Sequence, residues 1–139
     1  MEATSLQSQV DTLLIVDDEP LMTDLFRQYM TRRGFHVLTA SAGAEAIEML
    51  KPVLDTVRLV ITDMTLPGMD GLAIARAVEA LNPRMPVLMA TGHDRTGITF
   101  PPNVVGVVQK PYQNRALAEQ IRKIIDAHQS TDSAEMTVL

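Results

Sequence analysis

The chain has 139 residues, of which 46% are hydrophobic and 21% charged, and its formal net charge is −5. This size fits one domain with a buried core, while the acidic balance and the lack of cysteine argue against direct nucleic-acid binding, disulfide bridges and cysteine-ligated zinc. Without a signal-peptide pattern or an apolar stretch near the roughly 20 residues that span a bilayer, we expect a cytoplasmic protein that does not contact a membrane.

The first part of the chain shows two strand and helix patterns in succession. The continuous apolar run Thr12–Val16 predicts a strand that is buried on both faces. The next pattern predicts a helix that begins at Pro20 and ends before Gly34, because proline is tolerated in the first turn and glycine commonly follows the last. A second strand at His36–Ala40 and a helix at Ala42–Lys51 come next.

The middle of the chain repeats this order. A third strand is predicted at Arg58–Thr62 and is followed by the turn signal Leu66-Pro67-Gly68. Asp70 is a typical N-cap for the next helix, which we expect to end at Asn82-Pro83. The fourth strand is predicted at Pro86–Ala90.

The segment that follows the fourth strand interrupts the alternation. Residues 92–103 contain two glycines and a Pro-Pro pair, which favour at most one helical turn there. The pattern then resumes with a fifth strand at Val104–Val108 and a last helix at Asn114–His128. Alternating strands and helices favour a single α/β domain over residues 12–128, with a parallel sheet covered on both faces. Residues 1–11 are predicted to be a polar lead-in and residues 129–139 a flexible C-terminal tail.

Acidic residues and one lysine stand at the ends of three predicted strands. Asp17 and Asp18 follow the first strand, Asp63 follows the third, and Lys110 follows the fifth. Because the carboxyl ends of parallel strands gather at one edge of a sheet, we expect these side chains to converge. Clustered carboxylates repel one another unless a cation lies among them. The pattern therefore indicates a site for a hard divalent cation and a phosphoryl group.

Each of these residues also has an ordinary structural explanation when it is taken alone. Adjacent acids after a strand, such as Asp17 and Asp18, often begin a solvated loop or cap a helix. Lys110 could be a solvated surface lysine, and Thr91 could be a β-branched residue at the end of a strand without a chemical role. Only their joint placement favours a functional site.

In combination, these residues resemble the receiver domains of two-component response regulators over about residues 11–127. The resemblance is carried by Val16-Asp17-Asp18-Glu19-Pro20, Asp63-Met-Thr-Leu-Pro67-Gly-Met-Asp70-Gly71, Ala90-Thr91-Gly92 and Lys110-Pro111. It implies a doubly wound, flavodoxin-like α/β fold with a five-stranded parallel sheet of order 2-1-3-4-5. In this chain we expect the fourth helix of that fold to be shortened or irregular.

The resemblance also implies a role for Asp63. This carboxylate would accept a phosphoryl group from a phosphohistidine on a histidine kinase or a histidine phosphotransfer protein. The reaction would require Mg²⁺, with Asp18, Asp63 and the backbone carbonyl of Thr65 as ligands and Asp17 acting through a bound water. Phosphorylation would switch the conformation of the domain and alter its contacts with other proteins.

Two further residues complete the implied site. Lys110 would pair with one phosphoryl oxygen, and the Thr91 hydroxyl would donate a hydrogen bond to another. A cis peptide before Pro111 would direct Lys110 toward the site. With these roles, the chain is expected to be a signalling phosphoacceptor and not an enzyme that turns over external substrates.

Two alternative functions and one question about the context of the domain remain open from the sequence. A free-standing Mg²⁺-dependent phosphatase with an aspartyl nucleophile commonly needs a second acid two positions after it, where this chain has Thr65. A flavodoxin-like nucleotide or flavin module would be expected to have a glycine-rich phosphate loop after the first strand, where this chain has acids. If the chain is a receiver, it acts either alone or as the receiver part of a hybrid histidine kinase.

Overall fold

A five-stranded sheet, all of whose neighbouring strands are parallel, forms the centre of the computed structural model, which describes residues 10–92 and 97–138. The strands are β1 (Thr12–Val16), β2 (His36–Ala40), β3 (Val57–Asp63), β4 (Val87–Thr91) and β5 (Val104–Gln109). The helices are α2 (Pro20–Arg32), α3 (Gly43–Leu50), α4 (Gly71–Leu81) and α5 (Asn114–Val138), together with the short 3₁₀ helix η1 (Lys51–Val53). The strand order β2-β1-β3-β4-β5 confirms the predicted doubly wound α/β fold.

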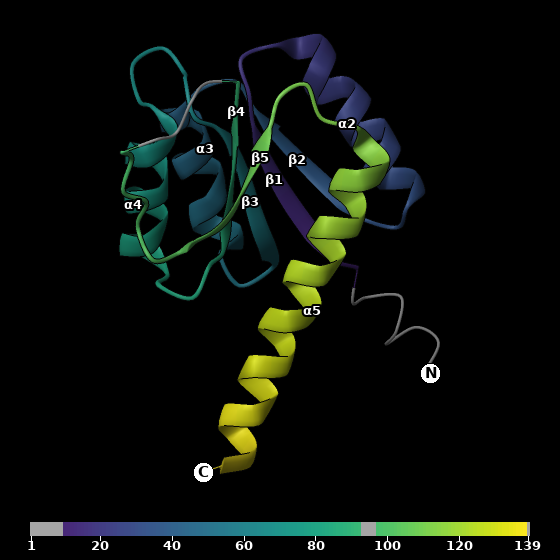
Figure 1. Cartoon of the computed structure of the whole chain (residues 1–139), viewed down its shortest axis with the longest axis vertical. Helices are drawn as coiled ribbons and strands as arrows, with labels where there is room; N and C mark the ends of the chain where they lie inside the picture. The colour runs from purple at the N-terminus through teal and green to yellow at the C-terminus, as the bar shows by residue number, and fades with distance from the viewer. Residues whose placement is uncertain (1–9, 93–96, 139) are drawn as a thin grey trace.

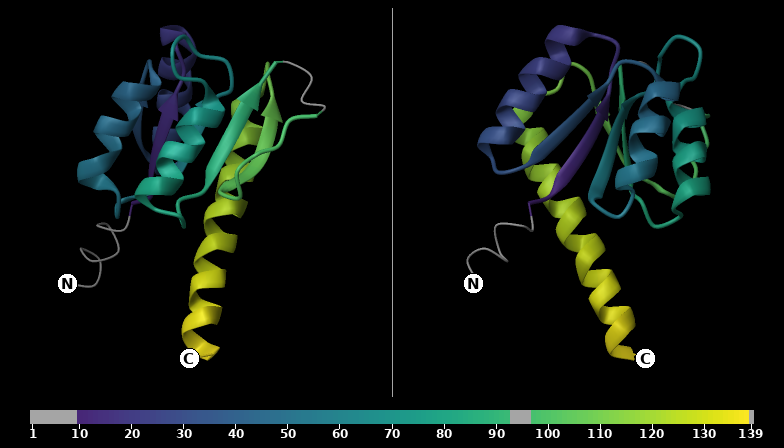
Figure 2. Two further views of the ribbon diagram at one scale, coloured as in Figure 1. Left: turned by 90° about the vertical axis from the view of Figure 1, so that its left-hand side faces the viewer. Right: turned by 180° about the vertical axis from the view of Figure 1, so that it is seen from behind.

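Helices cover both faces of the sheet, with α2 and α5 on one side and α3 and α4 on the other (Figures 1 and 2). Side chains of β1 alternate between the two layers. Leu13 and Ile15 pack with Phe26 of α2, whereas Leu14 and Val16 belong to the core beneath α3 and α4. Burial on both faces explains why β1 reads as a continuous apolar run and not as an alternating pattern.

Local sequence signals place most element boundaries correctly. Pro20 occupies the first turn of α2, and Gly34, which follows that helix, has a positive φ of 96° that favours glycine. The Asp70 side chain caps α4 by accepting a hydrogen bond from the backbone N–H of Ala73 at 2.9 Å. The predicted strands differ from the observed ones by no more than one residue at each end.

The connection between β4 and β5 has no helix in its described part, Gly97–Asn103, which confirms the expected irregularity there. Residues 93–96, which belong to the same prediction, lie outside the described part of the chain. Phe100 packs against the core on the α3 and α4 side. The Asn103 side-chain amide donates a hydrogen bond to the Ala75 carbonyl of α4 at 2.9 Å. Side-chain contacts therefore replace the missing helix in holding this connection.

The predicted end of the last helix at His128 is wrong. Helix α5 continues to Val138 and extends beyond the sheet (Figure 1), so the residues predicted to form a flexible tail are helical up to that point. The segment 129–138 contains neither glycine nor proline, so nothing in it breaks the backbone hydrogen bonds of the helix.

At the other end of the chain, the predicted polar lead-in falls mostly on residues 1–9, which lie outside the described residues. Asp11, the last residue of that lead-in, is half-buried. Its carboxylate lies 2.8 Å from the guanidinium of Arg122 in α5 and 3.6 Å from that of Arg58 in β3. This ion-pair group ties the start of the domain to its last helix.

Among the described helices, none combines the length with the apolar character that crossing a bilayer requires.

We expect Phe26→Ala to lower the free energy of unfolding by about 3–5 kcal/mol, because the ring is fully buried and its removal leaves a cavity. Leu21→Ala on the same helix is the matched control, since Leu21 is 71% exposed, and its effect should stay within about 0.5 kcal/mol. Urea unfolding followed by circular dichroism measures both values. Equal losses for the two variants would contradict this description of the core.

Candidate functional site

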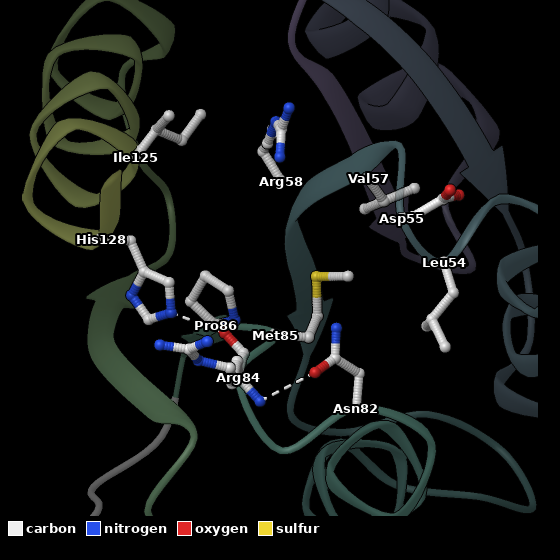
Figure 3. A pocket seen from close by; sticks show the side chains of 10 residues that line it. All are labelled: Leu54, Asp55, Val57, Arg58, Asn82, Arg84, Met85, Pro86, Ile125 and His128. Carbon is white, nitrogen blue, oxygen red and sulfur yellow. Dashed lines mark hydrogen bonds between the residues drawn. The ribbon is translucent and has the colours of Figure 1, made fainter. Parts of the chain in front are cut away.

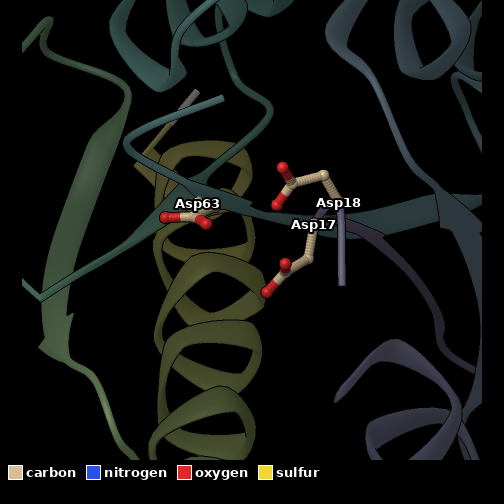
Figure 4. A group of neighbouring side chains, drawn as sticks. All are labelled: Asp17, Asp18 and Asp63. Atoms are coloured by element: carbon tan, nitrogen blue, oxygen red, sulfur yellow. The ribbon is translucent and has the colours of Figure 1, made fainter. Parts of the chain in front are cut away.

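The register of the sheet brings the acidic residues together at its carboxyl edge. Val16 of β1 is the register partner of Thr62 of β3, so the residues that follow, Asp17 and Asp63, emerge at the same level on neighbouring strands. Asp18 comes next in the chain after β1. Figure 4 shows the three side chains of Asp17, Asp18 and Asp63 grouped at this edge. One carboxylate oxygen from each lies within 4.8 Å of the others.

Lys110 reaches the same group from the edge strand β5. Thr91 and Gln109 are register partners, and the Lys110 backbone N–H donates to the Thr91 carbonyl at 2.8 Å. The Lys110 ammonium lies 3.0 Å from Asp17 Oδ2 and 3.1 Å from Asp63 Oδ2, so it bridges the two carboxylates. The Lys110-Pro111 peptide is cis, as the resemblance to receiver domains implied.

The carboxylates differ in exposure and in their backbone donors. The Asp17 side chain is 4% exposed, and its Oδ1 accepts a hydrogen bond from the Glu19 N–H at 3.0 Å. The Asp63 side chain is 12% exposed, and its Oδ1 accepts a longer hydrogen bond from the Thr65 N–H at 3.4 Å. Asp18 is exposed. Two nearly buried acids and one solvated acid therefore share one site.

The ammonium of Lys110 stays charged over the physiological pH range. Burial lowers its pKa, but hydrogen bonds to Asp17 and Asp63 outweigh burial, so the pKa is raised from 10.5 to about 12. Because the folded-state pKa exceeds the unfolded value, the stability that this group contributes is fully present below pH 10.5 and is lost as the pH rises through about 12. At neutral pH the lysine is therefore a fixed positive charge between two carboxylates.

The donor set of the site fits a hard divalent cation. All three side chains supply carboxylate oxygens, which are the ligands that Mg²⁺ prefers, and their oxygens are close enough to share one ion. Lys110 balances only part of the negative charge of Asp17, Asp18 and Asp63. The remaining negative charge would attract a divalent cation to this site.

The sequence-predicted residues outside this group lie at the same edge. Thr91 is the buried last residue of β4, one position beyond Ala90, which is the register partner of Asp63. Thr65 is exposed in the loop between β3 and α4. Sequence reasoning gave no role to Glu19, although its carboxylate lies 3.8 Å from the Lys110 ammonium. The acidic motif that contains Glu19 was the signal that could have indicated it.

A separate hollow of about 180 Å³ lies at the opposite end of the sheet, near the start of β3 (Figure 3). It is lined by Leu54, Asp55, Val57, Arg58, Asn82, Arg84, Met85, Pro86, Ile125 and His128. None of the residues predicted to form the functional site lines it. The acidic group, and not this hollow, is therefore the candidate site.

Comparison with known proteins agrees with this geometry. The family profile of the response regulator receiver domain matches residues 13–122, most of the chain. The chain belongs to this family. Receiver domains are the phosphoacceptors of two-component signalling systems, bind Mg²⁺ at an acidic pocket, and interact with histidine kinases or phosphotransfer proteins. Because the chain belongs to the receiver family, the alternative that this fold serves as a nucleotide-binding or flavin-binding module is no longer favoured.

Individual relatives show the same family in different contexts. The receiver domain is 37% identical over 81 residues to the transcriptional regulatory protein GlrR of Escherichia coli, which is 58% of this chain but 18% of GlrR. Among solved structures, a receiver domain protein from Clostridium thermocellum is similar with a TM-score of 0.82 and 25% identity, covering 88% of this chain and 99% of that one. The response regulator TrrA of Thermotoga maritima, in complex with Mg²⁺-BeF, has a TM-score of 0.73 and 25% identity, covering 83% and 99% of the two chains.

We expect Lys110→Met, in metal-free buffer at about pH 7, to lower the free energy of unfolding by about 1–3 kcal/mol, because two nearly buried carboxylates lose their cation. Urea unfolding measures the effect.

Lys51→Met is the matched control for this charge deletion. Lys51 pairs with Glu48 on the surface of the protein, with side chains 50% and 71% exposed, so its effect should stay below about 0.5 kcal/mol. Equal losses for the two variants would show that the loss of a cation between nearly buried carboxylates is not the cause.

Proposed function

We propose that this receiver domain takes a phosphoryl group from a phosphohistidine onto Asp63 in a Mg²⁺-dependent reaction and changes conformation as a result. The observation that carries the proposal is the ammonium of Lys110, which bridges Asp17 and Asp63 at 3.0 and 3.1 Å beside Asp18. The proposed acceptor carboxylate, a fixed cation and two further acids meet at the carboxyl edge of the sheet, where Asp18 is exposed.

In the proposed step, a carboxylate oxygen of Asp63 attacks the phosphorus of the phosphohistidine. A P–O bond forms, the P–N bond breaks, and its electron pair goes to the imidazole nitrogen of the donor, which is left as a histidine. Lys110 already contacts Asp63 Oδ2, so its ammonium is positioned to pair with an oxygen of the transferred group. The product is an aspartyl phosphate, which water later hydrolyses.

Asp17, Asp18 and Asp63, with the backbone carbonyl of Thr65, would hold the Mg²⁺ ion. When bound, the ion neutralises negative charge on the phosphoryl group as it is transferred. Binding of the ion would also reduce the repulsion among the three clustered carboxylates, because they would then have two positive centres among them instead of one.

After transfer, the Thr91 hydroxyl would donate a hydrogen bond to the phosphoryl group. Thr91 is buried at the end of β4, so moving it toward the phosphoryl group would also shift the connection that follows β4. This movement couples the chemistry at Asp63 to a surface that other proteins can contact.

The donor is proposed to be a histidine kinase or a histidine phosphotransfer protein, and the target another protein. The matched region spans 18% of the length of GlrR, so the activity of that whole protein is not carried over to this chain. A stand-alone receiver and the receiver part of a hybrid histidine kinase remain the two forms of the proposal. A cytoplasmic location, without direct contacts to nucleic acid or membrane, stays a prediction.

No observation favours the alternative of a phosphatase that turns over small phosphate esters. Such an enzyme would need a general acid two positions after Asp63, and Thr65 at this place cannot supply one. The Lys110 ammonium contacts Asp63 at 3.1 Å, but its pKa of about 12 makes it a poor proton donor at neutral pH.

We expect wild-type protein, incubated with Mg²⁺ and phosphoramidate, to gain one phosphoryl group by intact mass, whereas Asp63→Asn gains none. Phosphoramidate imitates the P–N bond of phosphohistidine, and the amide of the variant cannot form an acyl phosphate. Asp55→Asn, on an exposed turn at the other end of the sheet, is the control and should react like wild type. Labelling of Asp63→Asn at the wild-type rate would refute the proposed acceptor.

We expect Asp18→Asn to weaken Mg²⁺ binding at least about tenfold, because it removes one carboxylate ligand and one negative charge. Isothermal titration calorimetry measures the dissociation constant. Asp55→Asn serves again as the control, since it removes the same charge at a distance from the site and should leave the constant nearly unchanged. Equal affinities for wild type and Asp18→Asn would exclude Asp18 from the metal site.

A further inference from the structure

The loop between β3 and α4, residues 64–70, is in direct contact with the proposed acceptor. The Thr65 N–H donates to Asp63 Oδ1 at 3.4 Å, a longer hydrogen bond than the others of the site. At the end of the loop, the Gly71 N–H donates to the Met64 carbonyl at 2.9 Å. A displacement of this loop would therefore move a backbone group that contacts the acceptor carboxylate.

Gly43, the buried first residue of α3, packs closely against this loop from another element. A Cβ atom at this position would lie 2.8 Å from Met69 Sδ, 2.9 Å from Met69 Cβ and 2.9 Å from Ile74 Cγ1. The sulfur could rotate away, but the Cβ atom of Met69 is attached to the loop backbone. A side chain at position 43 therefore cannot be accommodated by a change of rotamer alone.

The loop is the partner that would yield to such a change. Helix α3 is fixed by Ala46 and Leu50, which are 1% and 0% exposed, and Ile74 of α4 is fully buried. In contrast, the loop has no regular secondary structure, and its residues Pro67 and Gly68 are exposed. An added side chain at position 43 would therefore displace Met69 and the loop backbone more readily than either helix.

We propose that Gly43 is a positioning residue for the phosphoryl-acceptor loop. Its lack of a side chain lets Met69 pack onto the start of α3, and this packing sets where the Thr65 backbone stands relative to Asp63. The consequence for Mg²⁺ and phosphoryl transfer rests on the function proposed above, whereas the position of the loop does not. Gly43 does not belong to the acidic group itself, and its effect on the loop passes through Met69.

The test is Gly43→Ala, read out in two ways. In metal-free protein, the backbone amide signals of Thr65 and Asp63 in a ¹H–¹⁵N spectrum should shift, while those of β1 and β2 stay in place. With Mg²⁺, the affinity for the ion and the rate of labelling by phosphoramidate should each fall about tenfold, a size typical of a disturbed supporting contact. Unchanged amide signals would overturn the proposal.

Leu50→Val at the end of α3 is the matched control. It removes one buried methylene from the same helix and lowers stability, but Leu50 lies at the other end of that helix from Gly43. We expect Leu50→Val to keep wild-type Mg²⁺ affinity and labelling rate. An equal fall for both variants would show that general destabilisation, and not loop position, is the cause, and would overturn the proposal.

A double variant tests the route through Met69. Met69→Gly removes both the sulfur and the Cβ atom that lie 2.8 and 2.9 Å from the added Cβ, so Gly43→Ala combined with Met69→Gly should lose less affinity than the two single variants predict together. Strictly additive losses would overturn the proposed contact. If wild-type protein is not labelled at all, the proposed function fails, while the amide shifts of Gly43→Ala still decide the positioning role.

Discussion

The structure depends on one electrostatic arrangement, in which a lysine ammonium lies between two nearly buried carboxylates. Unit charges about 4 Å apart interact by about 4 kcal/mol at an effective dielectric constant of 20, so carboxylates this close oppose folding unless a cation separates them. Lys110 supplies that cation; burial lowers its pKa, but its hydrogen bonds to Asp17 and Asp63 outweigh burial and raise it. Lys110 balances only part of the negative charge, and the proposed metal ion would balance more of it. The proposed function therefore rests on the same interaction that the fold requires.

The parallel sheet makes this arrangement possible. Strands that are buried on both faces have a fixed register, because a shift by one residue would exchange the side chains of the two apolar layers. A fixed register places the residues after β1 and β3 at the same level, so the carboxylates cannot move apart to relieve their repulsion. The cost of clustered charge is therefore offset by the apolar core of the domain.

The helices beside the site determine how precisely its loops are placed. Both α3 and α4 begin with a glycine that packs closely on the segment 63–69: a Cβ at Gly71 would lie 2.7 Å from the Asp63 carbonyl oxygen, and one at Gly43 would contact Met69. These helix starts restrict the loop that carries Thr65 from two sides. The connection after β4, in contrast, lacks a helix in its described part. The segment 63–69 is thus closely packed beside the site.

The sequence by itself determined the strands, the helix starts and the chemical character of the site, because these depend on local signals. Apolar runs, a proline at the start of α2 and Asp70 at the start of α4 act within a few residues of themselves. The sequence also predicted that Lys110 and the acidic residues converge, because the carboxyl ends of parallel strands meet at one edge. Only the tertiary structure decided that the ammonium bridges Asp17 and Asp63, and that Gly43 meets Met69. Such detailed contacts depend on how distant segments pack. The end of α5 was predicted wrongly, although it depends on local signals. The polar composition of the segment indicated a tail, but no residue there prevents a helix.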